Sequence, residues 1–539
     1  MPAATLPDRA DLIVTGGRVH TVNQSNDIAE AVAVGGGYVL AVGSDAEVRA
    51  WAGPGTREVE LRGRSLLPGF VDAHAHFAGV GAAQSAIDCK APGMQSIRAL
   101  QEAVRERAAK QPPGTWIRGR GYDQSRLAEQ RHPNRDDWDA VAPNHPVIFT
   151  RTCGHIQSVN SKAMDLAGID DSTPDPSGGR YDRADGRNLG VAYETAGTPL
   201  GAVSVLSREE YRDALLRANQ AYLAAGGTSV HDAGGLIGPP FAQCQDLVAA
   251  GQIQVRLYAF TTVNSFEHPL IGMLRTGLHT GFGDERLRMG AFKVITDGSS
   301  SGPTAATREP YTSDSDDFGI LYWAQDDLDD LIGRAHRQGF QCTVHAVGDK
   351  AIEQTLNAMA RAQSEFPREE LRHRIEHCGI TPPDLQQRVK AQGIVPAMQP
   401  AFFWEFGDGY IANYGQHRAD TMFPVKSLTE MGVTVAGSSD APVTNHAPLF
   451  GIQQALTRAT MDGQVCGPAE RVDLTTAIRL HTINGAYASF EEARKGSIEP
   501  GKLADLVLLA EDLSRVPVER IRETGVVMTL VGGEVVYEG

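Results

Sequence analysis

The chain lacks the features that would place it in a membrane or outside the cell. No uninterrupted apolar run approaches the ~20 residues that a membrane-spanning helix needs. The first residues, MPAATLPDRADLIV, have no basic segment followed by an apolar core, so we expect no secretory signal. Only six cysteines are present and none forms a C-x-x-C pair, which argues against a disulfide framework and a thiolate zinc site. These absences favour a cytoplasmic protein.

Basic residues are also few. Lys and Arg number 50 against 66 Asp and Glu, which gives a net charge of −16. Such a surface repels nucleic acid and anionic membranes, so we expect a small-molecule substrate as the main partner. Apolar residues make up 41% and charged residues 22% of the 539 residues, as in a folded chain of about two to four domains. For the assembly we expect a homodimer.

The two ends of the chain have the same character. Residues 1–66 contain DLIVTGGRVHTV and AEAVAVGGGYVLAVG, and residues 497–539 contain LADLVLLAEDL and VVMTLVGGEVVYEG. All four runs are apolar and rich in β-branched residues, which is typical of short strands. Neither end has enough strands to bury a sheet face alone. We therefore predict that the two ends meet in one small β-sandwich domain.

The middle of the chain, residues 67–496, alternates buried-strand candidates with amphipathic stretches of helical length. The strand candidates are residues 70–77, 228–232, 255–263, 287–296, 341–347, 373–378, 394–399 and 433–440. One helical stretch, residues 207–227, opens with a capping box formed by Ser207 and Glu210. Eight strands in alternation with helices predict an α/β fold, a (β/α)8 TIM barrel. A doubly wound open sheet is the alternative, but it gives no reason for the polar strand ends described below.

One interval is too long for a plain barrel. Residues 78–227 separate the first two strand candidates, whereas a strand–helix–strand unit needs only about 30 residues. We therefore predict that residues 85–205 form an inserted subdomain over the C-terminal mouth of the barrel, where loops carry function.

Polar side chains gather where the predicted barrel strands end. The first strand carries two histidines at positions i and i+2, which leave the same face of a strand. C-terminal strand ends meet at one mouth of a barrel, so residues far apart in the sequence become neighbours. Histidine, lysine and aspartate side chains in such a cluster suit one or two divalent ions. The candidate ligands are His74, His76, Lys293, His345, His377 and Asp440.

Some of these residues also have an ordinary structural explanation. A lone histidine in an apolar strand is usually a satisfied core residue, which is how we interpret His231 and His336. Asp440 could simply cap the helix that follows it. Lys293 is harder to explain, because a buried ammonium in the apolar segment AFKVI must be paired, deprotonated or modified.

Five segments carry a family resemblance: PGFVDAHAH, FKVITDG, VHAVGD, RIEHC and GSSDAPV. In this order and at these spacings they closely resemble the amidohydrolase superfamily of metal-dependent hydrolases. The segment RGRGYDQSRLAEQRHPNRDDWDAVAPNHPVIFTRTCGHIQSVNSKAM resembles the insertion of its YtcJ-like branch, which includes N-substituted formamide deformylase. Tyr122 stands where that branch usually has tryptophan, and Cys153 stands where it often has an acidic residue. Both departures bear on substrate preference more than on catalysis.

The resemblance implies a role for each candidate ligand. His74 and His76 would bind the more buried of two zinc ions, and Asp440 would bind it too and act as a proton shuttle. Lys293 would be carboxylated by CO2 and bridge the two ions, about 3.5–4 Å apart. The two remaining histidines would bind the second ion.

The insertion and the loops at the mouth supply candidate substrate contacts. We place His155 over the metals as a donor to the developing oxyanion, the alternative being a surface-loop histidine. Further candidates for the pocket wall are Tyr122, Asp123, Glu194, Trp323 and Phe402, the last of which precedes Phe403 and Trp404. The aromatic residues would suit an apolar substituent of the substrate or merely pack the lid. Asp297 is predicted to orient a metal ligand from behind.

The expected reaction is hydrolysis of a C–N bond other than a peptide bond, in an N-substituted formamide or a related small N-acyl compound. Asp440 would take a proton from the attacking water and deliver it to the leaving nitrogen. An ester, lactone or carbamate hydrolase would use the same site. A scaffold protein that has lost its ligands and a single-metal isomerase or decarboxylase are the remaining alternatives.

The bridging role of Lys293 generates a testable prediction. Lys293→Ala is expected to lose most of the activity and at least one metal ion per chain, because the bridging ligand is gone. Added short carboxylic acids are expected to restore part of the activity. Metal analysis and rates with and without the acids check this, and full activity of the variant would contradict a two-metal site.

Overall fold

The core of the computed structural model, which describes residues 6–234, 239–263 and 268–539, is an eight-stranded parallel sheet. Each strand pairs in parallel with the next strand of the barrel along the chain. The strands are β8 (Phe70–Ala75), β15 (Gly227–Asp232), β16 (Arg256–Val263), β17 (Leu287–Ile295), β18 (Cys342–Ala346), β19 (Arg374–His377), β20 (Val395–Met398) and β21 (Ala436–Gly437). Each strand falls within or overlaps one of the eight predicted segments.

The sheet nearly closes on itself. The first and last strands, β8 and β21, are joined just beyond β21, where the Asp440 amide donates to the His74 carbonyl at 2.7 Å. The His76 amide donates to the Ala441 carbonyl at the same distance. The fold is therefore a near-closed, TIM-like barrel, as the sequence predicts, and not an open sheet.

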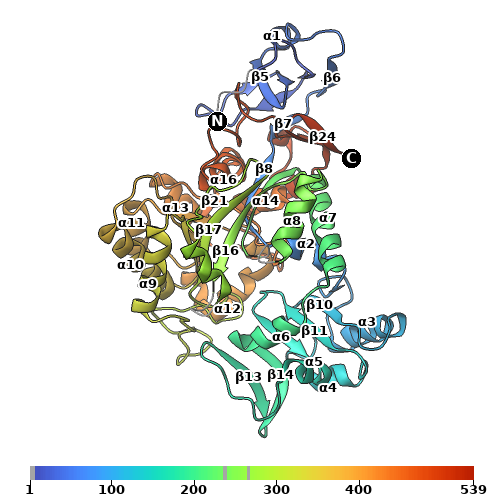
Figure 1. The fold of residues 1–539 in the computed structure, drawn as a ribbon, viewed down its shortest axis with the longest axis vertical. Helices are drawn as coiled ribbons and strands as arrows, with labels where there is room; N and C mark the ends of the chain where they lie inside the picture. The colour runs from blue at the N-terminus through green and yellow to red at the C-terminus, as the bar shows by residue number, and fades with distance from the viewer. Residues whose placement is uncertain (1–5, 235–238, 264–267) are drawn as a thin grey trace.

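Helices cover the outside of the barrel (Figure 1). Helix α7 (Arg208–Ala224) begins with the predicted Ser207–Glu210 capping box. Helix α9 (Gln325–Arg337) buries Leu328, Leu331, Ile332 and Ala335, the stripe expected from a period of 3.6 residues. The other helices around the barrel are α2 (Phe77–Ala83), α8 (Pro239–Ala249), α10 (Asp349–Glu365), α11 (Pro383–Ala391), α12 (Phe402–Thr421), α13 (Val425–Glu430), α14 (Pro448–Thr457), α15 (Leu474–Leu480) and α16 (Ile483–Ala488).

The two ends of the chain meet at one end of the molecule, at the top of Figure 1. A four-stranded sheet contains β1 (Leu12–Thr15), β4 (Ala31–Gly35), β5 (Tyr38–Gly43) and β6 (Arg57–Glu60). A six-stranded mixed sheet contains β2 (Arg18–His20), β3 (Ile28–Ala29), β7 (Ser65–Pro68), β22 (Leu506–Leu509), β23 (Val526–Val531) and β24 (Glu534–Glu538). Strands β7 and β22 pair across the chain, with Leu66 opposite Leu508. One apolar cluster spans both sheets, so neither end buries its strands alone.

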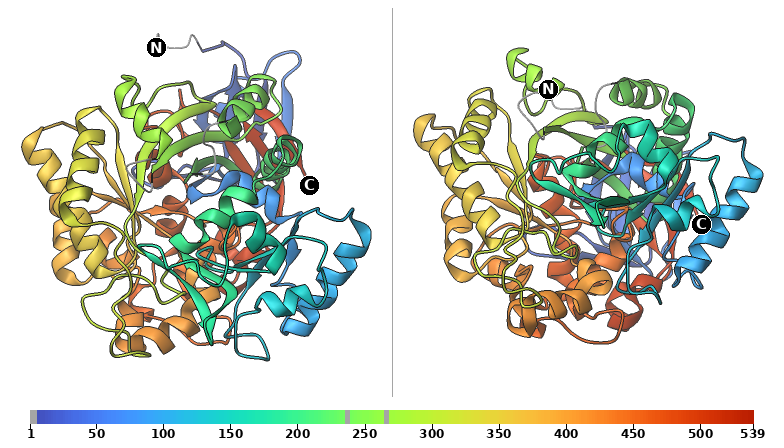
Figure 2. Two further views of the ribbon diagram at one scale, coloured as in Figure 1. Left: turned by 60° about the horizontal axis from the view of Figure 1, so that its bottom comes forward. Right: turned by 90° about the horizontal axis from the view of Figure 1, so that it is seen from below.

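The long segment between β8 and β15 forms a further six-stranded sheet of its own. Its strands are β9 (Ile87–Asp88), β10 (Ile117–Tyr122), β11 (Val147–Arg151), β12 (Ile156–Val159), β13 (Gly179–Ala184) and β14 (Arg187–Glu194). Helices α3 (Ile97–Lys110), α4 (Arg135–Asp139), α5 (Ser161–Ala167) and α6 (Thr198–Val203) belong to the same segment. Trp138 and Phe149 stack in its separate core. Viewed from below, the segment lies in front of the barrel (Figure 2).

Two general features concern membrane-spanning helices and cysteine pairing. In the part of the chain that the structure describes, no helix has the length and apolar character needed to cross a membrane. The six cysteines are all buried and free.

A buried ion pair ties the barrel to the terminal sheets. Arg256 at the start of β16 donates through Nε to Asp505 Oδ2 at 2.7 Å and through Nη2 to Oδ1 at 3.0 Å. Both side chains are almost fully buried. The Gly532 amide donates to the same carboxylate at 2.8 Å. The pair therefore links a barrel strand to the residues that flank β22 and β23.

We predict that Asp505→Asn lowers the free energy of unfolding by about 3–5 kcal/mol, because it leaves the buried Arg256 guanidinium with only the partly exposed Glu285 carboxylate, 3.6 Å away, as a counter-charge. The matched control is Glu538→Gln, which breaks an exposed pair with Arg57 and is expected to cost less than about 1 kcal/mol. Urea unfolding followed by tryptophan fluorescence measures both. Equal effects of the two substitutions would contradict the structural role of the buried pair.

Candidate metal centre

Three buried side chains from distant parts of the chain converge at the C-terminal mouth of the barrel. His74 lies in β8, His377 ends β19 and Asp440 follows β21. One potential ligand atom from each of the three lies within 4.8 Å of the others. His377 and Asp440 both adopt a left-handed backbone, with φ of 72° and 53°, a strained conformation that clusters at functional sites.

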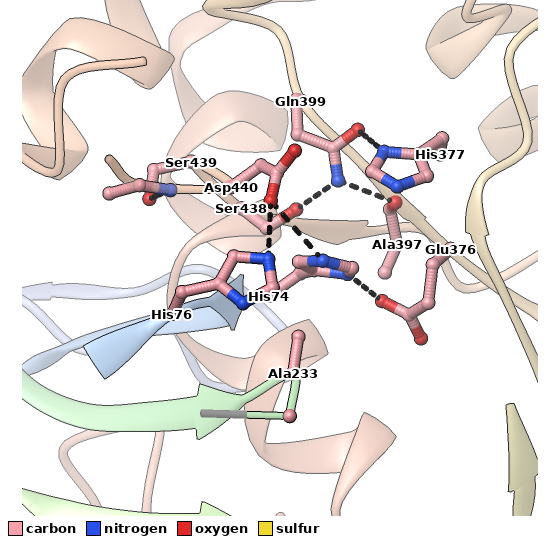
Figure 3. Close-up of polar contacts among 12 residues, drawn as sticks. His74, His76, Ala233, Glu376, His377, Ala397, Gln399, Ser438, Ser439 and Asp440 are labelled. Atoms are coloured by element: carbon pink, nitrogen blue, oxygen red, sulfur yellow. Dashed lines mark hydrogen bonds and ion pairs between the residues drawn. The ribbon is translucent and has the colours of Figure 1, made fainter. Parts of the chain in front are cut away.

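The hydrogen bonds of His74 determine which of its nitrogens faces the group. Its Nδ1 lies 2.5 Å from Glu376 Oε2 (Figure 3). Glu376 also accepts from Arg374 Nε at 2.7 Å and from the Thr343 hydroxyl. Burial raises the pKa of Glu376, but Arg374 and His74 outweigh it and hold the pKa well below its usual range. The carboxylate is therefore charged and accepts from Nδ1, so Nε2 is the His74 nitrogen that faces the group. Burial and Lys293 lower the pKa of His74, but Glu376 and Asp440 outweigh them and raise it.

A hydrogen bond also determines which nitrogen of His377 faces the group. Its Nδ1 lies 2.8 Å from Gln399 Oε1, and Gln399 Nε2 donates to Ala397 O at 3.0 Å and to Ser438 Oγ at 2.9 Å. These two acceptors fix the orientation of the amide, so Oε1 must accept from the His377 Nδ1–H. Burial, and then the neighbouring His74, lower the pKa of His377 to about 3. The ring is neutral and its Nε2 is free to bind an ion.

The Asp440 carboxylate supplies the third atom. Asp440 Oδ1 lies 3.4 Å from His74 Nε2 and 3.2 Å from His76 Nε2, but it is buried and makes no hydrogen bond among the described residues. A carboxylate oxygen and imidazole nitrogens this close repel one another unless a proton or a metal cation lies between them. The donor set, two or three imidazoles and a carboxylate, is one that divalent ions such as zinc prefer. The residues present therefore fit a divalent metal.

All six predicted ligands lie on the wall of one cavity of about 750 Å³. His345 lies beside the group, with its ring centroid 4.5 Å from that of His377. Lys293 is buried and its Nζ donates to Ala233 O at 3.0 Å. Burial lowers the pKa of Lys293, against the opposite effect of Glu376 and Asp440. The tightest group, however, joins His74 to His377, which the resemblance assigns to different metal ions.

The comparisons with known proteins agree with this geometry. The model of the amidohydrolase family matches residues 57–537. The chain belongs to the amidohydrolase family. It is 31% identical to N-substituted formamide deformylase of Arthrobacter pascens and 30% identical to the putative amidohydrolase YtcJ of Bacillus subtilis. These alignments cover 98% and 97% of this chain, and 98% of each relative.

Among solved structures, an uncharacterized metal-dependent hydrolase from Pyrococcus horikoshii superposes with a TM-score of 0.77. It is 24% identical in sequence, and the match covers 94% of this chain and 99% of the other. At this identity the likeness shows the fold alone.

His155 reaches this amidohydrolase-family site from the insertion. It lies between β11 and β12 on the cavity wall, with its ring centroid 5.5 Å from that of His345. Its Nδ1 lies 2.6 Å from Glu194 Oε2, and Glu194 accepts from Thr304 Oγ1 and Tyr322 OH, each at 2.6 Å. Burial lowers the pKa of His155, but Glu194 outweighs it and raises the pKa to about 9. The structure thus places a positively charged imidazole in the cavity, not on a surface loop.

Three other predicted residues lie near the cavity in different roles. Trp323 lines it and donates through Nε1 to Ile295 O at 2.8 Å. Phe402 packs behind the metal group, nearly parallel to the His377 ring at 5.9 Å. Asp297 accepts from the amides of three residues, Ala306, Val347 and Gly348, and lies 3.5 Å from His345 Nε2. Its carboxylate therefore orders the loop that follows β18 beside His345.

Tyr122 and Asp123 do not line the cavity, contrary to the prediction. Tyr122 is buried in the core of the insertion, where its hydroxyl lies 3.0 Å from His132 Nδ1. Asp123 pairs with Arg151 at 3.3 Å. The register of β10 shifts at Gly121, whose φ of 85° only glycine adopts readily, and Arg120 is the residue that lines the cavity.

Sequence reasoning missed Glu376, Gln399 and Arg120. A signal existed for Glu376, because HRIEHC places two opposite charges at i and i+2 of a buried strand, Arg374 and Glu376. Gln399 is a single amide after a strand, and nothing in its surroundings distinguishes it from a loop residue.

The Gln399–His377 hydrogen bond yields a prediction. Gln399→Leu is expected to weaken metal binding by about 10–100-fold, because His377 loses the acceptor that fixes its tautomer and orientation. Gln386→Leu on α11, which removes a hydrogen bond to Thr381 O, is the matched control and is expected to bind metal normally. Competition titration against a chelating dye measures both affinities. Unchanged affinity of Gln399→Leu would show that His377 is not a ligand.

Proposed function

We propose that this protein is a metal-dependent hydrolase that cleaves a C–N bond other than a peptide bond, in a small amide such as an N-substituted formamide. The observation that carries the proposal is the convergence of His74, His377 and Asp440 beside a cavity of about 750 Å³. The similarity to N-substituted formamide deformylase over nearly the full length of both chains supports an amide as the substrate.

The metal ligands follow from the donor set. His74, His377 and Asp440 would hold one divalent ion, and His76, His345 and Lys293 line the same cavity for a second. We infer that Lys293 is carboxylated, because this converts a desolvated cation into an anion that can bridge two metals. A divalent ion bound there polarises a carbonyl group and makes a neighbouring water more acidic.

The other steps belong to the side chains of this chain. The Asp440 carboxylate would accept a proton from the attacking water and pass it to the leaving nitrogen, which leaves poorly unless protonated. His155, charged and held by Glu194, would donate to the amide oxygen as negative charge develops on it. The insertion that carries His155 would cover the mouth and limit the access of water.

The test compares zinc-reconstituted protein on N-alkyl and N-aryl formamides with the matching formate esters. Formamide hydrolysis is expected, together with its loss in the presence of a chelator and its recovery with added zinc. Asp440→Asn should lower formamide hydrolysis by about 10²–10⁴-fold and hydrolysis of aryl esters by less, because an aryloxide leaves without a proton. Asp326→Asn on the exposed start of α9 is the control.

The outcomes separate the alternatives. Hydrolysis of esters but of no formamide would replace the proposal by an esterase of the same site. Absence of hydrolysis in metal-loaded protein, with neither class of compound turned over, would overturn the enzymatic proposal.

A further inference from the structure

Arg120 brings a group of a different kind to the cavity, a guanidinium. It lies on β10, on the strand face opposite Ile117 and Gly119, which face the core of the insertion. Arg120 lines both the main cavity and an adjoining one of about 440 Å³, and Pro442 lines both as well. Its guanidinium therefore stands in the wall between the two hollows.

The Arg120 side chain is half-buried, and its guanidinium has few partners within the protein. Among the described residues, its one hydrogen bond is from Nε to Pro442 O at 3.4 Å, and no carboxylate lies within ion-pair distance. Burial lowers the pKa of Arg120 to about 10, so the group is charged at neutral pH. Such a desolvated cation costs free energy unless an anion or several acceptors meet it.

The fully buried arginines of the chain show what such compensation looks like. Arg151, Arg256 and Arg374 each have a carboxylate partner, at 3.3, 2.7 and 2.7 Å respectively. Arg458 has no carboxylate but donates to three carbonyls, those of residues 422, 423 and 466. Arg120 has neither form of compensation.

The nearby cation, Lys90, is fully paired. Its Nζ lies 3.1 Å from Glu405 Oε2 and donates to Val443 O at 2.9 Å. The chain thus places a carboxylate against Lys90 and leaves Arg120 facing the cavity. A phosphate dianion would need more than one free cation at this end, whereas a single guanidinium fork matches one carboxylate.

We propose that Arg120 binds a carboxylate of the substrate, so that the preferred amides are N-acyl compounds with an acidic group on the amine side, such as N-acyl amino acids. This inference rests on the proposed function. The amine side follows from the position of Arg120: its Nε contacts Pro442, two residues after Asp440, the group assigned to protonate the leaving nitrogen. A carboxylate near the scissile nitrogen would therefore meet the guanidinium.

The experiment uses two substrates that differ by one charge, N-formylphenylalanine and its primary amide, with the zinc-loaded protein. The wild type is expected to prefer the acid, and Arg120→Gln should reduce that preference in kcat/KM by about 10–100-fold, mainly through KM, because a charge-assisted hydrogen bond is lost. Arg120→Lys should retain part of the preference, since it keeps the charge but not the fork.

Arg118→Gln is the matched control. Arg118 lies two residues earlier on the same strand face and contacts Ser204 O and Glu210 instead of the cavity. It is expected to keep the wild-type preference. An equal loss of preference in this variant would contradict a specific role for Arg120.

A binding measurement tests the role of Arg120 independently of the proposed hydrolase function. Calorimetry with 3-phenylpropionate and 3-phenylpropanamide needs no turnover, and Arg120→Gln is expected to weaken binding of the acid by about 10–100-fold relative to the amide. Unchanged binding of the acid would overturn the role of Arg120, since the metal alone would then hold the carboxylate. Absence of amide hydrolysis with Arg120-dependent binding intact would overturn the proposed function but not the anion site.

Discussion

The candidate site depends on the seam between the first and last strands of the barrel. There the Asp440 amide donates to the His74 carbonyl, and the His76 amide donates to the Ala441 carbonyl, each at 2.7 Å. Asp72 reinforces the seam, because it accepts from the Ser439 amide at 3.0 Å and from the OH of Tyr222 on α7 at 3.0 Å. Without this closure, the carboxylate that follows β21 would not face the imidazole on β8.

The seam brings together atoms that do not stabilise one another. Asp440 Oδ1 is buried without a hydrogen bond among the described residues, and two imidazole nitrogens, those of His74 and His76, face it at 3.4 and 3.2 Å. Leaving such a buried acceptor unsatisfied costs about 1–3 kcal/mol. Glu376 and Gln399 hold the two rings in this orientation instead of relieving it. The arrangement is understandable as a site prepared for a cation. The charged His155 and Arg120 on the insertion are in turn proposed to bind negatively charged parts of the substrate.

Much of the fold could be predicted because its signals are local. The eight barrel strands are short apolar runs, five of which carry a ligand candidate at or near the C-terminal end, and α7 begins at a capping box. The meeting of the chain ends followed from a count of strands too few to bury a face. The six ligand candidates were recognisable because a parallel barrel gathers the C-terminal ends of its strands.

The contacts around the ligands were less accessible to sequence reasoning. Which side of β10 faces the cavity depends on the irregularity at Gly121, so Tyr122 was placed in the pocket and Arg120 was overlooked. The role of Gln399 depends on where two acceptors, Ala397 O and Ser438 Oγ, lie in space. Such features arise from tertiary geometry, for which a single chain carries no periodic pattern.

What the measurement tests is whether the mouth of the barrel binds catalytic metal. The most direct test is the metal content per chain by mass spectrometry, on protein purified without chelator and in the presence of bicarbonate. We expect about two divalent ions per chain. A chain that binds no divalent ion, even after reconstitution with zinc, would contradict it.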